Sequence, residues 1–96
     1  MEVQRQWGQV LQGVKDEKVT VHAWFMDGDP VSVLEDAVLV AFKNNIHRET
    51  TEKPANKQVI EGVLHDKLGK PYHLVTMMQR DWAAAIEAPA PSRKRN

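Results

Sequence analysis

The stretch that decides the fold is KVTVHAWFMDGDPVSVLEDAVLVAFK, residues 18–43. It holds three short runs rich in β-branched and aromatic residues, a composition typical of strands. The predicted strands cover Val19–Met26, Val31–Glu35 and Ala37–Lys43. Between the first two, Asp27-Gly28-Asp29-Pro30 predicts a hairpin turn, because Gly permits positive φ, Asp caps the turn and Pro fixes φ.

Alternation within the first run predicts which side chains reach the core. Side chains two residues apart share one face of a strand, and the expected core face is Val19, Val21, Ala23 and Phe25. Trp24 is then expected on the opposite face. The run Ala37–Lys43 is nearly continuous apolar sequence, which is typical of a central strand covered on both faces.

Helices are predicted on both sides of this stretch. Apolar residues spaced i, i+3, i+4, i+7 predict a helix over residues 3–16, with the stripe Trp7, Val10, Leu11 and Val14. A short helix follows Asn44 or Asn45 and runs to about Arg48. A longer one has Pro54 in its first turn and ends at Gly69. Its predicted buried stripe is Val59, Ile60, Val63, Leu64 and Leu68.

The chain closes with a predicted strand, Tyr72–Met78, and a predicted helix, Asp81–Ala88. The expected fold class is α+β: a small three- to four-stranded sheet with helices packed on one face. One domain is expected over residues 1–88. Residues 89–96 form a Pro-rich, basic tail that is expected to be disordered.

Composition restricts the class of protein. The chain has 96 residues, 42% of them hydrophobic and 27% charged, as in a single globular domain. It has no cysteine, 13 basic and 13 acidic residues, and no apolar run of the ~20 residues that a membrane span needs. No signal peptide is visible. We expect a cytoplasmic protein without the basic bias of nucleic-acid binders.

No residue group has the pattern of a catalytic or metal site. The histidines, His22, His47, His65 and His73, lack the spacing of metal ligands on a helix. The glycines form no phosphate-binding loop, and neither serine lies in a nucleophile elbow. Asp27-Gly28-Asp29 lacks the ligand pattern of a calcium loop, so the turn is favoured. We expect no enzyme activity and no cofactor.

Candidate partner-binding residues are Trp24, Met26, Met78, Arg80 and Trp82. Exposed aromatic residues beside an arginine are typical anchors for a protein partner, and methionine suits an adaptable binding surface. An alternative stays open for Trp82, which can instead hold a C-terminal helix against the domain.

The order of residues resembles a known family. The resemblance lies in Trp7-Gly8-Gln9-Val10-Leu11, the pair His22-Ala23, the segment Gly28-Asp29-Pro30-Val31, the run Leu39–Lys43, and the helix residues Asn56, Val59, Ile60 and Leu64 ahead of Trp82. Over residues 5–82 the chain resembles the C-terminal region of the gamma/tau subunit of bacterial DNA polymerase III, in its Gram-positive form.

This resemblance implies a truncated KH-like fold. It also implies a non-catalytic interaction domain that tethers the clamp loader to the replicative polymerase catalytic subunit, the replicative helicase, or both. The clamp-loader ATPase module and the KH G-x-x-G loop are absent from the sequence. The chain is then expected to be one domain of a longer subunit, with weak or no nucleic-acid contact. The alternative is a KH-like single-strand nucleic-acid binder, supported by Lys57, Lys67 and Lys70.

Overall fold

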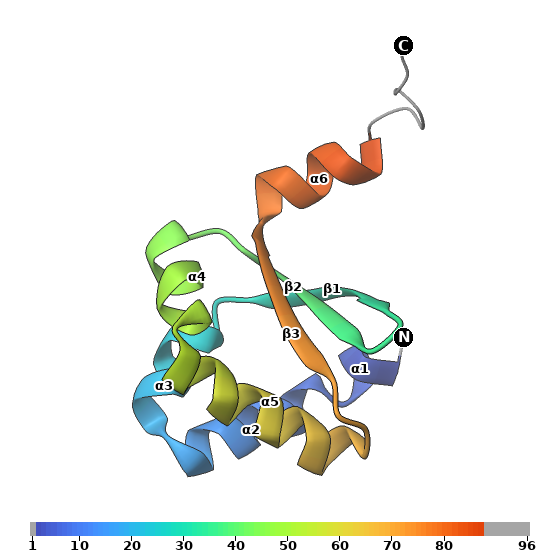
Figure 1. Cartoon of the computed structure of the whole chain (residues 1–96). Coiled ribbons are helices and arrows are strands. Elements are labelled where there is room, and N and C mark those ends of the chain that lie inside the picture. The colour runs from blue at the N-terminus through green and yellow to red at the C-terminus, as the bar shows by residue number, and fades with distance from the viewer. Residues whose placement is uncertain (1, 88–96) are drawn as a thin grey trace.

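The computed structural model describes residues 2–87, which form a three-stranded mixed sheet and six helices (Figure 1). In chain order the elements are α1 (Glu2–Arg5), α2 (Trp7–Glu17), α3 (Val19–Phe25), β1 (Asp29–Leu34), β2 (Ala37–Phe42), α4 (Asn45–Glu52), α5 (Pro54–Leu68), β3 (His73–Met78) and α6 (Gln79–Glu87). The strand order is β1-β2-β3, with β1 antiparallel and β3 parallel to β2. The predicted α+β class is confirmed, and so is β2 as the central strand. The expected tail, residues 89–96, lies outside the described residues.

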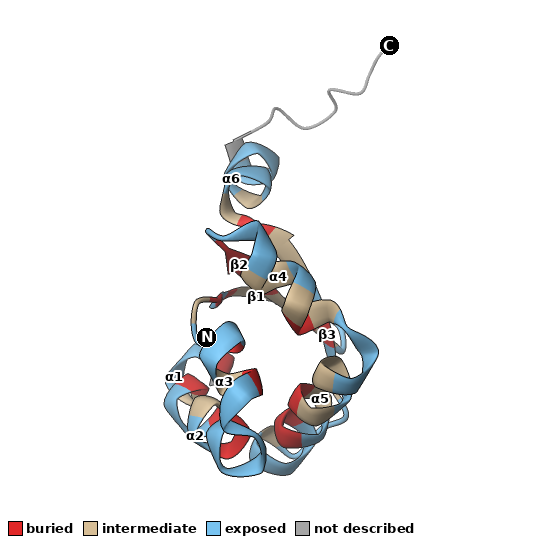
Figure 2. Ribbon diagram, turned by 90° about the vertical axis from the view of Figure 1, so that its left-hand side faces the viewer, coloured by how far each residue is buried: buried red, intermediate tan, exposed pale blue. Residues whose placement is uncertain are grey.

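The helical layer covers one face of the sheet. Figure 2 shows α1, α2, α3 and α5 on one side of the strands and α6 on the other. Alternate residues of β2 reach this layer, and Val38, Val40 and Phe42 are fully buried. They pack with Val10 and Val14 of α2, Phe25 of α3, Ile60 and Leu64 of α5, and Leu74 of β3. The stripe predicted on residues 7–14 is confirmed, although its member Leu11 is only partly buried.

The segment predicted as the first strand is a helix. α3 covers Val19–Phe25 and buries Val21 and Phe25, which lie four residues apart on one helical face. The ring of Phe25 packs against Trp7, with ring centroids 5.3 Å apart. The predicted core face was wrong for Val19 and Ala23, which are exposed. Local β-propensity is a weak preference, and burial of two large side chains against α2 overrides it.

The predicted hairpin at residues 27–30 is a helix-to-strand connection. β1 already includes Asp29 and Pro30, and the connection needs glycine for a packing reason. A Cβ atom on Gly28 would lie 2.5 Å from Val40 Cγ1 and 2.7 Å from Phe42 Cζ. The hairpin turn between β1 and β2 is instead Glu35-Asp36, where Glu35 has a φ of 57°.

The helices after the sheet begin and end close to the predicted residues. Asn44 caps α4, which continues to Glu52 rather than ending near Arg48. Pro54 is the first residue of α5, and Gly69 ends that helix with a φ of 73°. β3 begins one residue later than expected. α6 begins two residues earlier, directly after β3.

Candidate partner-binding surface

Trp24 and Met26 lie at the C-terminal end of α3, beside α4. The Trp24 ring packs against the His47 ring at a centroid distance of 5.4 Å and stays 37% exposed. Met26 is exposed, as is Ile46 of α4. We call Trp24, Met26 and Ile46 the α3–α4 patch. It is apolar, but its central ring is already engaged within the domain.

A polar pair lies next to this patch. His47 Nδ1 is 3.4 Å from Asp27 Oδ2, and both atoms are buried without a hydrogen-bond partner. The pair joins the connection after α3 to the first turn of α4. Its geometry fits a structural contact between the two segments.

The other three candidate residues lie at the end of β3 and in α6. Met78 is buried on the helical side of the sheet, and its neighbour Met77 points to the opposite side. Arg80 is exposed and Trp82 is half-buried. The structure therefore does not bring the five candidates together as one patch. Their role in binding stays a prediction.

The face of the sheet opposite the helical layer is apolar and largely open. Pairing places alternate residues of the three strands on it. We call this the outer sheet face and define it by its members on the three strands, which include polar as well as apolar side chains: Asp29, Ser32 and Leu34 of β1, Ala37, Leu39 and Ala41 of β2, and His73, Val75 and Met77 of β3. The expectation that β2 is covered on both faces was wrong, because Ala37 and Leu39 are only half-buried.

Exposure on the outer sheet face rises with distance from α6. Ala41, nearest the end where α6 begins, is fully buried, and Met77 beside it is half-buried. At the other end Leu34 is 65% exposed, and Val75 is 41% exposed. α6 packs against β2 and β3, and Gln79 Nε2 donates to Asp29 Oδ2 across the strand ends at 3.1 Å. The first turn of α6 thus lies at one end of this face, and the rest of the helix extends away from the strands, with residues 83–86 exposed (Figures 1 and 2).

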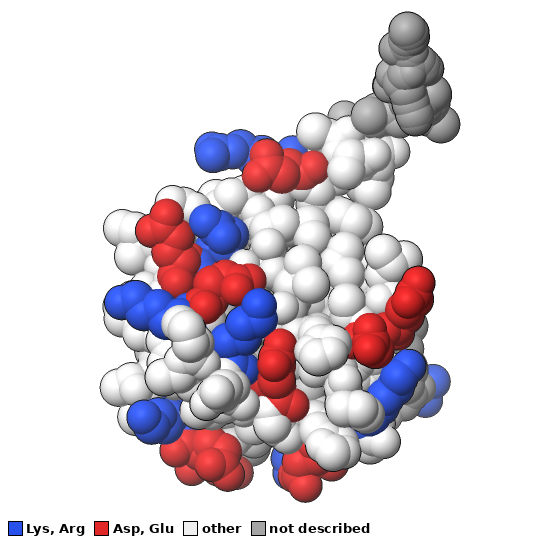
Figure 3. Space-filling model, in the orientation of Figure 1, with Lys and Arg blue, Asp and Glu red and all other residues white. Residues whose placement is uncertain are grey.

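Figure 3 shows what this arrangement does to the surface. An uncharged area extends below α6, and acidic and basic side chains gather around its margins. Single exposed apolar residues are ordinary in a small protein, but a contiguous apolar face rimmed by charge is typical of an interaction site.

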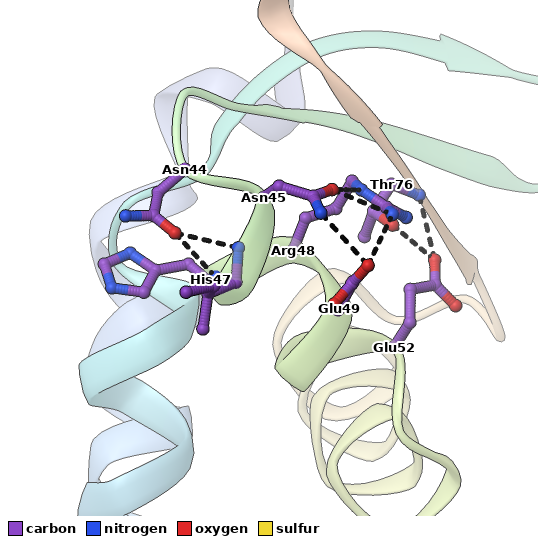
Figure 4. A network of polar contacts seen from close by, with 8 residues as sticks. Asn44, Asn45, His47, Arg48, Glu49, Glu52 and Thr76 are labelled. Carbon is purple, nitrogen blue, oxygen red and sulfur yellow. Dashed lines mark hydrogen bonds and ion pairs between the residues drawn. The ribbon is translucent and has the colours of Figure 1, made fainter.

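The free edge of β3 is closed by two carboxylates. The N–H groups of Leu74 and Thr76 donate to Glu61 Oε2 at 2.9 Å and Glu52 Oε2 at 3.2 Å. The Thr76 hydroxyl also donates to Glu52, and Lys57 Nζ donates to the other Glu52 oxygen at 3.0 Å. Figure 4 shows Glu52 of α4 reaching Thr76. Both outward N–H groups are therefore occupied within the domain.

The ionisation of Glu52 reflects these contacts. Partial burial acts to raise its pKa, but the hydrogen bonds from Thr76 and Lys57 and the Lys57 charge outweigh it, so the pKa lies below the usual 4.5. A carboxylate that is stabilised in its charged form by these partners fits a cap on the β3 edge.

The edge of β1 is also occupied near its start. Pro30 has no N–H to donate, and its carbonyl accepts a hydrogen bond from Gln4 Nε2 of α1 at 2.9 Å. An additional residue, Val31, interrupts the register between Pro30 and Ser32. Such a bulge twists an edge strand away from regular pairing.

A groove of about 440 Å³ lies between α2 and α5. The two helices approach closely there, since a Cβ on Gly13 would lie 2.7 Å from Val63 Cγ1. Asp16, Glu17, Asp66 and Lys67 are among its lining residues. Within residues 2–87 no group of three or more His, Asp or Glu side chains is placed to hold a metal ion. No helix in this part of the chain is long and apolar enough to cross a bilayer.

A mixed sheet with helices on one face and an apolar second face defines an α+β domain whose open surface suits a protein partner. Comparison with protein families then gives the identity: the chain belongs to the family of the C-terminal domain of DNA polymerase III subunit tau, whose model matches residues 1–96. The domain therefore has its place in DNA replication. Searches of the curated proteins and of the solved structures found no match. The Gram-positive type and the likeness to a KH fold remain predictions.

Sequence reasoning missed the outer sheet face. It recognised the run Ala37–Lys43 as a central strand but assigned it two covered faces. One signal was available in the sequence. Most of the predicted amphipathic segments are needed to cover one face of the sheet, and few are left to cover the other. Burial of a second face depends on whether another helix crosses it, and that information is not local.

Proposed function

We propose that this domain is a non-catalytic docking module of subunit tau. In this proposal it tethers the clamp loader to the replicative polymerase catalytic subunit, the replicative helicase, or both, and acts in the cytoplasm. The observation that carries the proposal is the outer sheet face, with Leu34 and Val75 exposed on it. Membership of the tau C-terminal domain family supports the proposal, because a subunit of DNA polymerase III has other replication proteins available as partners.

The two clusters of polar side chains in the domain are consistent with groups that hold the fold together. Glu52, whose pKa is lowered, has hydrogen-bond partners that all hold β3 and α5 in place. Asn45, Arg48 and Glu49 bond to one another on an exposed helix surface. None of these side chains lines the groove between α2 and α5.

Calorimetric titration tests the proposal. The chain is titrated with the cognate polymerase catalytic subunit and, separately, with the cognate helicase. We expect saturable binding to at least one of them. An absence of heat and of co-elution for both partners, with the domain shown to be folded by circular dichroism, would overturn the proposal.

The nucleic-acid alternative has less support. Lys57 is paired with Glu52 at 3.0 Å, Lys67 lies 3.8 Å from Asp66, and the Lys70 ammonium lies over the Tyr72 ring. Lys and Arg bind nucleic acid by neutralising its phosphates, which releases the counterions held by the nucleic acid. A lysine that already has a partner in the domain is less available for this. The alternative predicts affinity for single-stranded DNA or RNA that falls steeply with salt. Fluorescence anisotropy at low and high salt checks it.

A further inference from the structure

We propose that the outer sheet face receives an amphipathic helix of the partner, laid across β2 and β3 beside α6, and that the partner adds no strand to the sheet. This inference rests on the proposed docking function. It goes further by naming the surface and the secondary structure of the bound segment. It also predicts the kind of side chain that the segment presents: an apolar stripe with basic residues at one end.

The first argument is the chemistry of the face. Leu34 and Val75 are exposed on it, and Leu39 and Ala37 between them are half-buried. The polar residues Ser32, half-buried, and His73, exposed, lie on the same face. Three strands about 4.8 Å apart present a surface about 10 Å wide, which is the width of one helix. A helix with apolar residues at i, i+3, i+4 and i+7 would fill this width continuously.

The second argument is that the edge of β3 is occupied at Leu74 and Thr76 and the edge of β1 is occupied at Pro30. The outward N–H groups of Leu74 and Thr76 on β3 donate to Glu61 and Glu52. On β1, Pro30 has no N–H, and its carbonyl is bonded to Gln4. Strand addition would have to break these contacts, whereas a helix on the face would leave all of them intact.

The third argument is that the first turn of α6 already lies against one end of this face. α6 packs against β2 and β3 at one end, and Ala41 beneath that end is fully buried. The remaining length of the face continues the same surface without a cover. A second helix beside α6 would complete a layer like the one on the opposite side of the sheet.

Charge indicates how the partner helix is oriented. Glu35 and Asp36 form the β1–β2 turn at the open end of the face, and both are exposed. Acidic and basic side chains both border the uncharged area in Figure 3. Lys70 Nζ lies 3.5 Å from the carbonyl oxygen of Glu35 rather than from its carboxylate, and His73 Nε2 lies 3.9 Å from Asp36 Oδ2, so the turn keeps two exposed carboxylates. Lys or Arg residues of the partner helix are therefore expected over this turn, where opposite charges fix the register more than they add affinity.

The decisive experiment compares substitutions on two surfaces of the 96-residue chain. Leu34→Lys and Val75→Thr alter the outer sheet face, and threonine keeps the β-branched shape of valine. Ile46→Lys and Val19→Lys are controls of matched exposure, since Ile46 is 65% and Val19 62% exposed, against 65% for Leu34. All four are checked for folding by thermal denaturation. Each is then titrated with the partner that binds the unsubstituted chain.

We expect the outer-face variants to weaken binding about tenfold or more, as for residues at the centre of an interface, and the controls to bind normally. Unchanged binding by folded outer-face variants, or loss confined to Ile46→Lys, would overturn the inference while leaving the docking function standing. Failure of the unsubstituted chain to bind either partner would instead contradict the proposed function.

Two further measurements test whether the outer sheet face binds something other than a partner helix, namely a second copy of this chain or an extended segment. Analytical ultracentrifugation shows whether the chain alone dimerises; a dimer abolished by Leu34→Lys would assign the face to a second copy and reject the inference. Chemical shifts of the isotope-labelled partner segment in the complex report its secondary structure. Helical shifts are expected, and an extended segment with contacts to the β3 or β1 backbone would reject the helix.

Discussion

Glu52 of α4 accepts a hydrogen bond at 3.2 Å from the main-chain N–H of Thr76, which lies 24 residues further along the chain on the edge of the sheet. The contact joins the helical layer to β3 and satisfies an N–H that would otherwise be available to another chain. Hydrogen bonds to a charged group are worth about 1.5–3 kcal/mol when formed in a protected position. The stability of this edge therefore depends on the charge of one carboxylate.

Glu52→Ala is expected to lower the free energy of unfolding at neutral pH by roughly 1–3 kcal/mol. The pKa of Glu52 is lowered in the folded state, so its contribution is present above the unfolded value of 4.5 and is lost as the pH falls through the folded pKa. The difference between variant and unsubstituted chain should shrink in acid. Urea denaturation across this range measures it.

Glu49→Ala is the matched control for that prediction. Glu49 is on the same helix but exposed, with contacts only to Asn45 and Arg48. Its substitution should change stability by less than about 0.5 kcal/mol, as for other surface positions. If the difference in unfolding free energy between Glu52→Ala and the unsubstituted chain stayed constant down to strongly acidic pH, the assigned role of the carboxylate charge would be contradicted.

Asn44→Ala is expected to destabilise the domain by about 1 kcal/mol. The Asn44 side chain accepts from the N–H groups of Ile46 and His47 at 2.8 and 3.1 Å (Figure 4), which have no other partner in the first turn of α4. Asn45→Ala is the control, because its side chain bonds to Glu49 and Arg48 of the same helix rather than to main-chain N–H groups. Equal effects of the two substitutions would contradict the capping role. Thermal denaturation compares them.

Alanine substitutions at two glycines are expected to change the free energy of unfolding in opposite directions. A Cβ on Gly62, on the exposed surface of α5, would meet no atom within 4 Å, so Gly62→Ala should stabilise the helix by about 0.5–1 kcal/mol. Gly28→Ala would press against Val40 and Phe42 in the core and should cost about 1–3 kcal/mol. Chemical denaturation of both variants tests this packing. If Gly28→Ala stabilised the domain, residue 28 would not lie against Val40 and Phe42, and this position of the connection after α3 would be contradicted.

Ala23→Thr distinguishes the helix at residues 19–25 from the strand that the sequence suggests. Ala23 is exposed in the middle of α3. Threonine is worse than alanine in a helix by about 0.6 kcal/mol but better in a strand, so the substitution should destabilise the domain. Denaturation midpoints give the sign. An increase in stability would favour the strand.

The pattern of the sequence was informative where one residue type fits one local role. Pro54 at the first position of α5, Gly69 at its end and Asn44 before α4 each mark a helix boundary through backbone chemistry that operates within a few residues. The stripe of α2 and the apolar run of β2 were likewise recognised from spacing alone. These features make the fold class predictable.

The partner-binding candidates were less predictable, because exposure is a property of the packed molecule. Met78 and Met77 are adjacent, and only the pairing of β3 with β2 decides which of them enters the core. Trp24 was expected on the strand face opposite the core, yet its position in α3 brings it against His47. Arg80 and Trp82 are carried on α6, away from the α3–α4 patch (Figure 1).

The sequence by itself determined the apolar stripe of α2, the caps of the later helices, the central strand and the family. Tertiary structure alone decided that residues 19–25 are a helix, because the burial of Val21 and Phe25 against α2 outweighs their strand preference. It also decided that one face of the sheet stays open. A strand's neighbours on its second face come from distant segments, and no local pattern encodes whether such a segment arrives.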